Sequence, residues 1–310
     1  MLIDGFFRGL AAAGKLHPGA RSAHRAVEVL RDVPYAPGGA RHHLLDIYHP
    51  LPARRPGPWP VVLYIHGGGF RILSKDSHWV MGLAFAQRGY LVLNINYRLA
   101  PRFRFPAALE DACAAFRWAQ ENARGHGGDP GRVIVAGESA GANLATSLVL
   151  CCCYRRDEAA ARSVWETGCV PRAALPSCGL LQVSDPRRFG RRRRLPRCVT
   201  DRLEQISSSY LPEDGTTAST ELADPLLVLE RGQPPDRPLP AFHAAVGTRD
   251  PILDDTRRLK AALDRLGVPC EARYIEGEPH AFNAFAWRRG ARAYWREVYA
   301  FLDRVVPAEP

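Results

Sequence analysis

Short apolar runs recur along this chain, and most of them are followed by a stretch with the composition of a helix. Examples are VVLYIH (61–66), LVLNINY (91–97), RVIVAG (132–137) and AFHAAVG (241–247). Because these runs lack regular polar alternation, they predict strands of a parallel sheet that is buried on both faces. The alternation of strand and helix then predicts right-handed βαβ units. The sequence therefore indicates an α/β fold, with a mostly parallel central sheet flanked by helices.

The remaining elements follow from the same kinds of pattern. Prolines and glycines punctuate an extended region from Val27 to Tyr48, which predicts a hairpin, and residues 1–30 carry apolar side chains at near-helical spacing. Further strands are expected near 174–183 and at 270–277, and a turn rich in glycine, aspartate and proline is expected at 127–131. The expected helices span 78–88, 107–124, 140–154, 254–266 and 288–305.

An irregular block interrupts this pattern between about 184 and 238, where charges, prolines and short helical pieces dominate. The alternation of strand and helix resumes at residue 241. We therefore interpret the block as an insertion between two strands of one sheet, and not as a second domain with its own core.

Charge does not assign a function to the chain. Lysine and arginine number 42 against 32 aspartates and glutamates, which gives a net charge of +10, and the densest basic run is RRFGRRRR (187–194). A nucleic-acid site would need interleaved aromatic residues or a recognition helix beside such a run. The favoured interpretation is a solvated loop, and no nucleic-acid partner is predicted.

The sequence predicts neither membrane insertion nor export. It contains no run of about 18 uncharged apolar residues, which a transmembrane helix requires. Asp4 and Arg8 interrupt the apolar start of the chain, whereas a secretory signal keeps its apolar region uncharged. The expected location is the cytoplasm.

The eight cysteines predict reduced thiols and no metal site. No two form a CxxC pair, and no set of cysteine and histidine has zinc-finger spacing. Cys151, Cys152 and Cys153 follow each other in an expected helix, where free cysteine packs as a small apolar side chain.

The segment GESAG (137–141) joins an apolar strand to an expected helix. A strained turn in that setting exposes the serine hydroxyl, and small flanking residues let the backbone bend sharply. We therefore predict that Ser139 is a nucleophile. The alternative is an ordinary strand-to-helix turn rich in small residues. Glu138 is expected to be a structural hydrogen-bonding residue.

The segment HGGGF (66–70) follows the strand at 61–65. Three consecutive glycines leave backbone N–H groups uncovered, which suits a loop that donates hydrogen bonds to a developing oxyanion. A phosphate-binding loop is the competing functional interpretation, but neither of the common glycine-rich phosphate motifs is present. A flexible turn is the remaining alternative.

A serine nucleophile needs a base, and the base needs an orienting acid. His280 lies in a loop after an expected strand, where active sites of open α/β sheets collect, whereas His243 falls inside an apolar strand and is expected in the core. Asp250 begins the loop after the strand 241–247, while Asp254 and Asp255 suit the first turn of the next helix. We expect His280 to titrate near the ordinary histidine pKa of about 6.5.

These motifs together resemble the hormone-sensitive-lipase-like carboxylesterases, a bacterial family of the α/β-hydrolase fold. The order of serine, aspartate and histidine along the chain is the α/β-hydrolase order. The matching segments are HGGGF (66–70), NYRLAPRFRFPAALED (96–111), GESAGANLA (137–145), DPLL (224–227), GTRDPILDD (247–255) and PHAF (279–282).

The resemblance implies a catalytic triad of Ser139, His280 and Asp250, and no cofactor. It also implies an oxyanion hole made of the backbone N–H groups of Gly68, Gly69 and Ala140, and a small helical cap over the site. The implied division is an N-terminal cap segment at 1–30, a cap insertion at 184–222, and a catalytic domain made of 31–183 and 223–310. Phe70 is expected to line the substrate pocket, with a plain core position as the alternative.

The resulting hypothesis is a hydrolase of short- to medium-chain carboxylic esters that works through an acyl-enzyme. The alternative among enzymes is an amidase or N-acyl hydrolase that uses the same catalytic groups. The alternatives outside enzymes are a ligand receptor and a polyanion-binding protein. The expected partner is a small-molecule ester, with no stable membrane insertion. Homodimerisation is left open.

Overall fold

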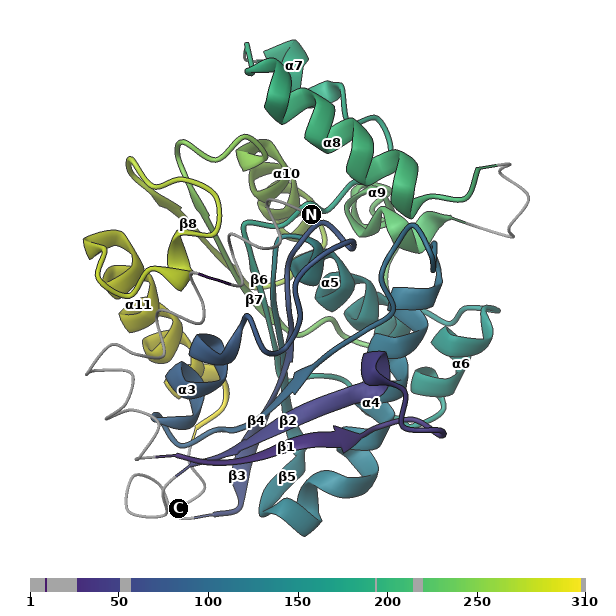
Figure 1. Ribbon diagram of the computed structural model, residues 1–310, viewed down its shortest axis with the longest axis vertical. Helices are drawn as coiled ribbons and strands as arrows, with labels where there is room; N and C mark the ends of the chain where they lie inside the picture. Colours follow the sequence, from purple (N-terminus) through teal and green to yellow (C-terminus); the bar gives the residue numbers. More distant parts are fainter. Residues whose placement is uncertain (1–8, 10–26, 51–56, 193, 214–219, 308–310) are drawn as a thin grey trace.

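The fold is built on one eight-stranded sheet with the order β1-β2-β4-β3-β5-β6-β7-β8 (Figure 1). It is seen in a computed structural model that describes residues 9, 27–50, 57–192, 194–213 and 220–307. The strands are β1 (Glu28–Pro34), β2 (Leu44–His49), β3 (Trp59–Ile65), β4 (Leu91–Ile95), β5 (Gly128–Glu138), β6 (Ala173–Ser177), β7 (Ala241–Gly247) and β8 (Cys270–Ile275).

The strand directions confirm the mostly parallel sheet. β1 pairs with β2 and β2 with β4 in antiparallel fashion, so the expected hairpin is present, and all other neighbours run parallel. Strands β4 and β6 are buried along their whole length, as a sheet covered on both faces requires. Residues 28–30, the last of the proposed N-terminal segment, belong to β1. The helix expected in the preceding residues lies outside the described part of the chain, apart from Gly9.

Helices cover both faces of the sheet (Figure 1). One apolar core contains residues of α4, α5, α6 and α10, and the other contains residues of α3 and α11. The helices over the sheet are α3 (Trp79–Ala86), α4 (Ala107–Asn122), α5 (Ala140–Cys153), α6 (Ala159–Trp165), α9 (Pro225–Glu230), α10 (Leu253–Arg265) and α11 (Arg289–Val305). Within α5 the three consecutive cysteines are fully buried free thiols, as predicted.

Three local features differ from the sequence-based expectation. The turn expected at 127–131 falls at the start of β5, where Gly128 and Asp129 pair with β3 and residues 130–132 interrupt the pairing. The helix α6 was not expected at all. The strand expected to reach 183 ends at Ser177, and Cys178 then turns the chain with a φ of 48°.

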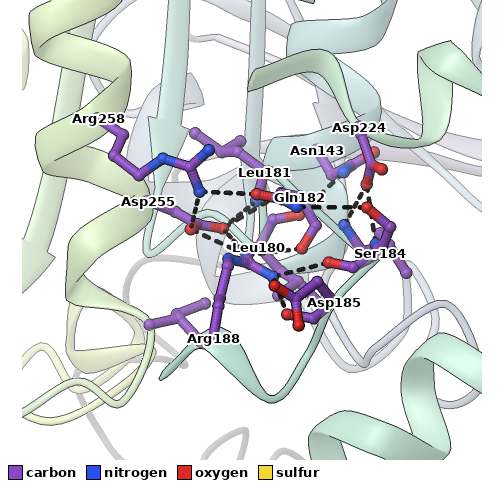
Figure 2. A network of polar contacts seen from close by, with 12 residues as sticks. Asn143, Leu180, Leu181, Gln182, Ser184, Asp185, Arg188, Asp224, Asp255 and Arg258 are labelled. Carbon is purple, nitrogen blue, oxygen red and sulfur yellow. Dashed lines mark hydrogen bonds and ion pairs between the residues drawn. The ribbon is translucent and has the colours of Figure 1, made fainter. Parts of the chain in front are cut away.

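Two buried carboxylates hold the chain that leaves the sheet after β6 (Figure 2). Asp255 Oδ2 accepts the backbone N–H groups of Leu181 and Gln182, at 2.9 and 3.2 Å. Asp224 Oδ1 accepts those of Val183 and Ser184. Because these N–H groups donate to side chains, the segment cannot continue the ladder of β6.

The insertion forms α7 (Arg188–Arg192) and α8 (Arg197–Tyr210), which lie beyond the sheet at one end of the molecule (Figure 1). The basic run that precedes α8 is not only a solvated loop. Arg188 reaches inward, and its Nη2 donates to Asp255 at 2.7 and 2.9 Å (Figure 2). By contrast, Arg191 is exposed and pairs with Asp185 on the surface.

The described part of the chain contains no helix that is long and apolar enough to cross a membrane.

The ion pair of Arg188 and Asp255 should stabilise the fold far more than the surface pair of Arg191. Removing Arg188 leaves the fully buried Asp255 without its main counter-charge, and breaking such a pair costs about 3 kcal/mol or more. An exposed pair contributes less than about 1 kcal/mol. We expect Arg188→Met to lower the free energy of unfolding, measured in urea at pH 7, by several times as much as Arg191→Met. Equal losses in the two variants would contradict this role for Asp255.

Candidate active site

Ser139 occupies the turn that joins β5 to α5. Its backbone has a φ of 57°, which is rare outside glycine and marks local strain. A Cβ on Gly137 would lie 2.3 Å from the carbonyl oxygen of Gly141, and one on Gly141 would lie 2.0 Å from that of Ile65. Glycine is therefore required on both sides of the serine, since any side chain would collide with backbone.

The loop after β3 brings a second backbone element to the same place. His66, which opens it, is buried, stacks on Tyr97 at 4.2 Å, and donates from Nδ1 to the carbonyl oxygen of Gly67 at 2.7 Å. Burial lowers the pKa of His66 to about 3, so the ring is neutral at ordinary pH. This histidine shapes the loop and does not change its protonation state near pH 7.

The glycines of this loop leave donors uncovered. Gly68 has a φ of 113°, and a Cβ there would lie 2.1 Å from the carbonyl oxygen of Ile72. The N–H groups of Gly68 and Gly69 have no hydrogen-bond acceptor among the described residues. Ala140 is the first residue of α5, where a helix supplies no acceptor for the N–H group. The three groups named by the sequence are therefore free to donate.

His280 and Asp250 meet as predicted. His280 Nδ1 lies 2.8 Å from Asp250 Oδ2, and Asp250 is fully buried. The other carboxylate oxygen accepts the backbone N–H of Ile252 at 3.0 Å. Both oxygens of the acid are thus engaged, which fixes the ring of His280 in one orientation and leaves Nε2 available to a reactant.

The surroundings of His280 raise its pKa to about 9. Burial of the ring acts to lower the pKa, but the charge of Asp250, the hydrogen bond to it and the charge of Glu138 together outweigh burial. The sequence-based expectation of a value near 6.5 was therefore wrong. The side chain of His280 is 37% exposed, and this open surface faces the cavity described next.

One cavity of about 1350 Å³ unites these groups. Gly68, Gly69, Ser139, Asp250 and His280 all line it. The rest of the lining comes from two parts of the chain: one is α8 with Leu180, and the other is α3, α11 and the segment that leads into α11. The first part contributes Leu180, Cys198, Val199, Arg202, Leu203 and Ile206, and the second contributes Leu83, Ala84, Phe285, Trp287, Trp295 and Tyr299 among others.

Phe70 does not line this cavity, which corrects the expectation that it contributes to the substrate pocket. Its side chain is fully buried and stacks on Tyr210 of α8, with ring centroids 3.7 Å apart. The alternative core position is the one found. Ala140 is likewise buried and contributes its backbone alone.

The other candidate residues have structural roles. His243 is fully buried in β7, and burial lowers its pKa to about 4, so it is a core histidine as expected. Asp254 and Asp255 do lie in the first turn of α10. However, Asp254 pairs with Arg257 at 3.3 Å on the surface, whereas Asp255 is buried against Arg188.

The sequence did not indicate two groups that act on or lie near His280. Glu138 Oε2 lies 3.7 Å from Nε2 of His78 and raises the pKa of His280 by its charge. Cys178 brings its sulfur within 4.8 Å of ligand atoms of Asp250 and His280, a trio that could in principle hold a metal ion. Burial raises the pKa of Cys178, so its thiol is neutral at ordinary pH. No motif in the sequence could indicate this contact, because Cys178 owes its place to the kink after β6.

Comparison with known proteins places this geometry among the α/β-hydrolases. A family model described as an alpha/beta hydrolase fold matches residues 62–284. Esterase LipI of Mycobacterium tuberculosis is 31% identical over 268 residues, which cover 84% of this chain and 76% of that protein. Ethyl acetate hydrolase of Pseudomonas putida is 32% identical over 231 residues, which cover 71% of this chain and 65% of the relative.

A solved structure described as an esterase from the bacterial hormone-sensitive lipase family is similar over nearly the whole chain. The two superpose with a TM-score of 0.74 at 25% sequence identity, covering 98% of this chain and 90% of the other.

The titration of His280 tests the geometry directly. We expect its ring protons, followed by NMR and assigned with His280→Gln, to titrate well above 6.5, because Asp250 favours the charged ring. In Asp250→Asn the carboxylate charge is lost and burial dominates, so the pKa should fall. Asp254→Asn, the matched control, should leave the pKa unchanged. A His280 pKa that does not respond to Asp250→Asn would contradict the pairing.

Proposed function

The chain is a carboxylic ester hydrolase that belongs to the hormone-sensitive-lipase-like group of the α/β-hydrolase fold, and from this premise we propose that it cleaves short- to medium-chain acyl esters with Ser139, His280 and Asp250. The observation that carries the proposal is the meeting of three parts in one cavity. These are the serine on its strained turn, the histidine bound to a buried acid, and the uncovered N–H groups of Gly68 and Gly69.

Acylation begins when Nε2 of neutral His280 accepts the proton of the Ser139 hydroxyl. The serine oxygen attacks the ester carbonyl carbon, and the carbonyl oxygen gains negative charge. The N–H groups of Gly68, Gly69 and Ala140 donate to this oxygen, and they need no rearrangement because the backbone already holds them. The imidazolium then gives its proton to the leaving alkoxide, which departs as an alcohol.

Deacylation repeats these steps with water. Nε2 of His280 accepts a proton from water, the hydroxide attacks the acyl carbon, and Ser139 leaves as its hydroxyl after receiving the proton. Asp250 holds the same ring orientation throughout and stabilises the imidazolium in both halves of the reaction. His280 must be neutral to accept a proton. Because its pKa is raised to about 9, we expect the rate of hydrolysis to rise with pH up to about that value.

The cavity supports a medium limit on chain length. The apolar side chains of α8 that line it run from Val199 to Ile206, a distance of about 10 Å along the helix. This stripe can shelter a medium acyl chain, but a long fatty chain would extend beyond it.

Ser139→Ala should abolish hydrolysis of p-nitrophenyl butyrate, and His280→Ala should come close to abolishing it, with folding intact by circular dichroism. Loss of one member of such a triad lowers kcat by about 10⁴ or more. Asp250→Asn should be far more damaging than Asp254→Asn, because Asp250 contacts the ring whereas Asp254 pairs with Arg257. If Asp254→Asn were the crippling change, the wrong carboxylate has been assigned.

A series of p-nitrophenyl esters should show kcat/KM rising with acyl length up to about eight carbons and falling beyond. Each methylene buried against the apolar stripe contributes about 0.8 kcal/mol, and this gain ends where the stripe ends. The matching p-nitroanilides test the amidase alternative, and we expect them to be poor substrates. Efficient hydrolysis of emulsified triolein would overturn the proposed length limit.

A further inference from the structure

The charged groups that line the cavity are unevenly distributed. Both of its carboxylates face a histidine. Glu138 lies 3.7 Å from His78, and Asp250 lies 2.8 Å from His280. Its arginines have no carboxylate partner among the described residues; they are Arg88, Arg202, Arg292 and Arg296. No acidic side chain of the lining is therefore left to neutralise the arginines.

Arg202 stands out among them because its position relative to the reacting groups is fixed. It lies on α8 four residues before Ile206, so the two share one face of the helix about 6 Å apart. Ile206 in turn packs against Gly69, where an added Cβ would lie 2.8 Å from its side chain. Arg202 is thus about one helical turn from the loop that holds the free N–H groups.

A second arginine acts on Arg202 by its charge, although it is not among the residues that line the cavity. Arg71 follows the glycine loop directly, and its Nε is buried with no hydrogen-bond partner among the described residues. Burial, and next the charge of Arg71, lower the pKa of Arg202 from its ordinary value. The two guanidinium groups therefore repel each other. Within the described part of the chain, the side chain of Arg202 has a polar contact only with that of neutral Gln205, at 3.1 Å.

Building on the proposed ester hydrolysis, we propose that the preferred substrates carry a carboxylate a few carbons from the scissile ester, and that Arg202, reinforced by Arg71, binds it. A bound carboxylate relieves the repulsion between the two arginines and accepts the donors that the protein leaves unused. A guanidinium and a carboxylate also match in shape, since both are planar and can form two parallel hydrogen bonds. A doubly charged phosphate would lose more hydration in a cavity whose walls are largely apolar.

The test compares each anionic ester with its neutral amide isostere. In the first pair, monoethyl glutarate and ethyl 5-amino-5-oxopentanoate, the carboxylate or amide lies on the acyl side of the ester. In the second pair, the acetyl esters of 4-hydroxybutanoate and 4-hydroxybutanamide, it lies on the alcohol side. In at least one pair we expect kcat/KM of the wild type to favour the anion by about tenfold at low salt, the effect of one charged hydrogen bond. The preference should shrink as salt is added.

Variants identify the residue responsible. Arg202→Gln should reduce the ratio of anionic to neutral kcat/KM to near one, Arg71→Gln should reduce it partly, and Arg202→Lys should retain part of it. Arg191→Gln removes the same charge from α7, outside the cavity lining, and serves as the matched control with an unchanged ratio.

Two results would overturn the inference: equal or better use of the amides by the wild type in both pairs, or a preference for the anions that survives in Arg202→Gln. Hydrolysis of the neutral amide esters that disappears in Ser139→Ala would still uphold the proposed function in either case. Absence of hydrolysis of all four esters and of p-nitrophenyl butyrate would instead refute the proposed function itself.

Discussion

The contact between the start of α5 and the end of β3 determines where the reacting groups can lie. Gly141 packs so closely on the carbonyl oxygen of Ile65 that a Cβ would have only 2.0 Å of space. Ile65 ends β3 and leads into the glycine loop, while Gly141 follows Ser139 by two residues. One backbone contact therefore sets the serine beside the donors of Gly68 and Gly69. Strain at Ser139 persists because β5, buried inside the sheet, and α5, buried along its length, hold the turn from both sides.

The insertion is held over this site by polar contacts at its base and apolar contacts above the loop. Asp255 binds Arg188 and the chain that leaves β6 (Figure 2), and it lies in the first turn of α10, five residues after Asp250. Further along, Ile206 contacts Gly69, and Tyr210 stacks on Phe70. The residues that hold the insertion are thus neighbours in sequence of Asp250, which binds His280, and of the glycine loop after β3.

Much of this arrangement could be predicted from the sequence, because it depends on local patterns. Strand and helix alternation fixed the sheet, and the glycines around Ser139 and after His66 indicated turns whose backbones approach other backbone closely. Contacts between distant segments carry no such signal. The strand after residue 173 was predicted too long because nothing near it shows that Asp255 and Asp224 take its N–H groups. Phe70 was misplaced for the same reason, since its partner Tyr210 lies 140 residues away.

The pKa of His280 also depends on distant contacts, and it reveals how charge is arranged in the cavity. The groups that raise it are Asp250, through its charge and a hydrogen bond, and Glu138, through its charge. Negative charge therefore lies next to the histidine, whereas Arg202 lies on α8 of the insertion. A substrate with a neutral ester and a distant carboxylate complements both ends, because the reverse orientation would bring its charge to the two acids. Because Asp250 and Glu138 face histidines, they do not pair with the arginines that would bind the carboxylate of such a substrate.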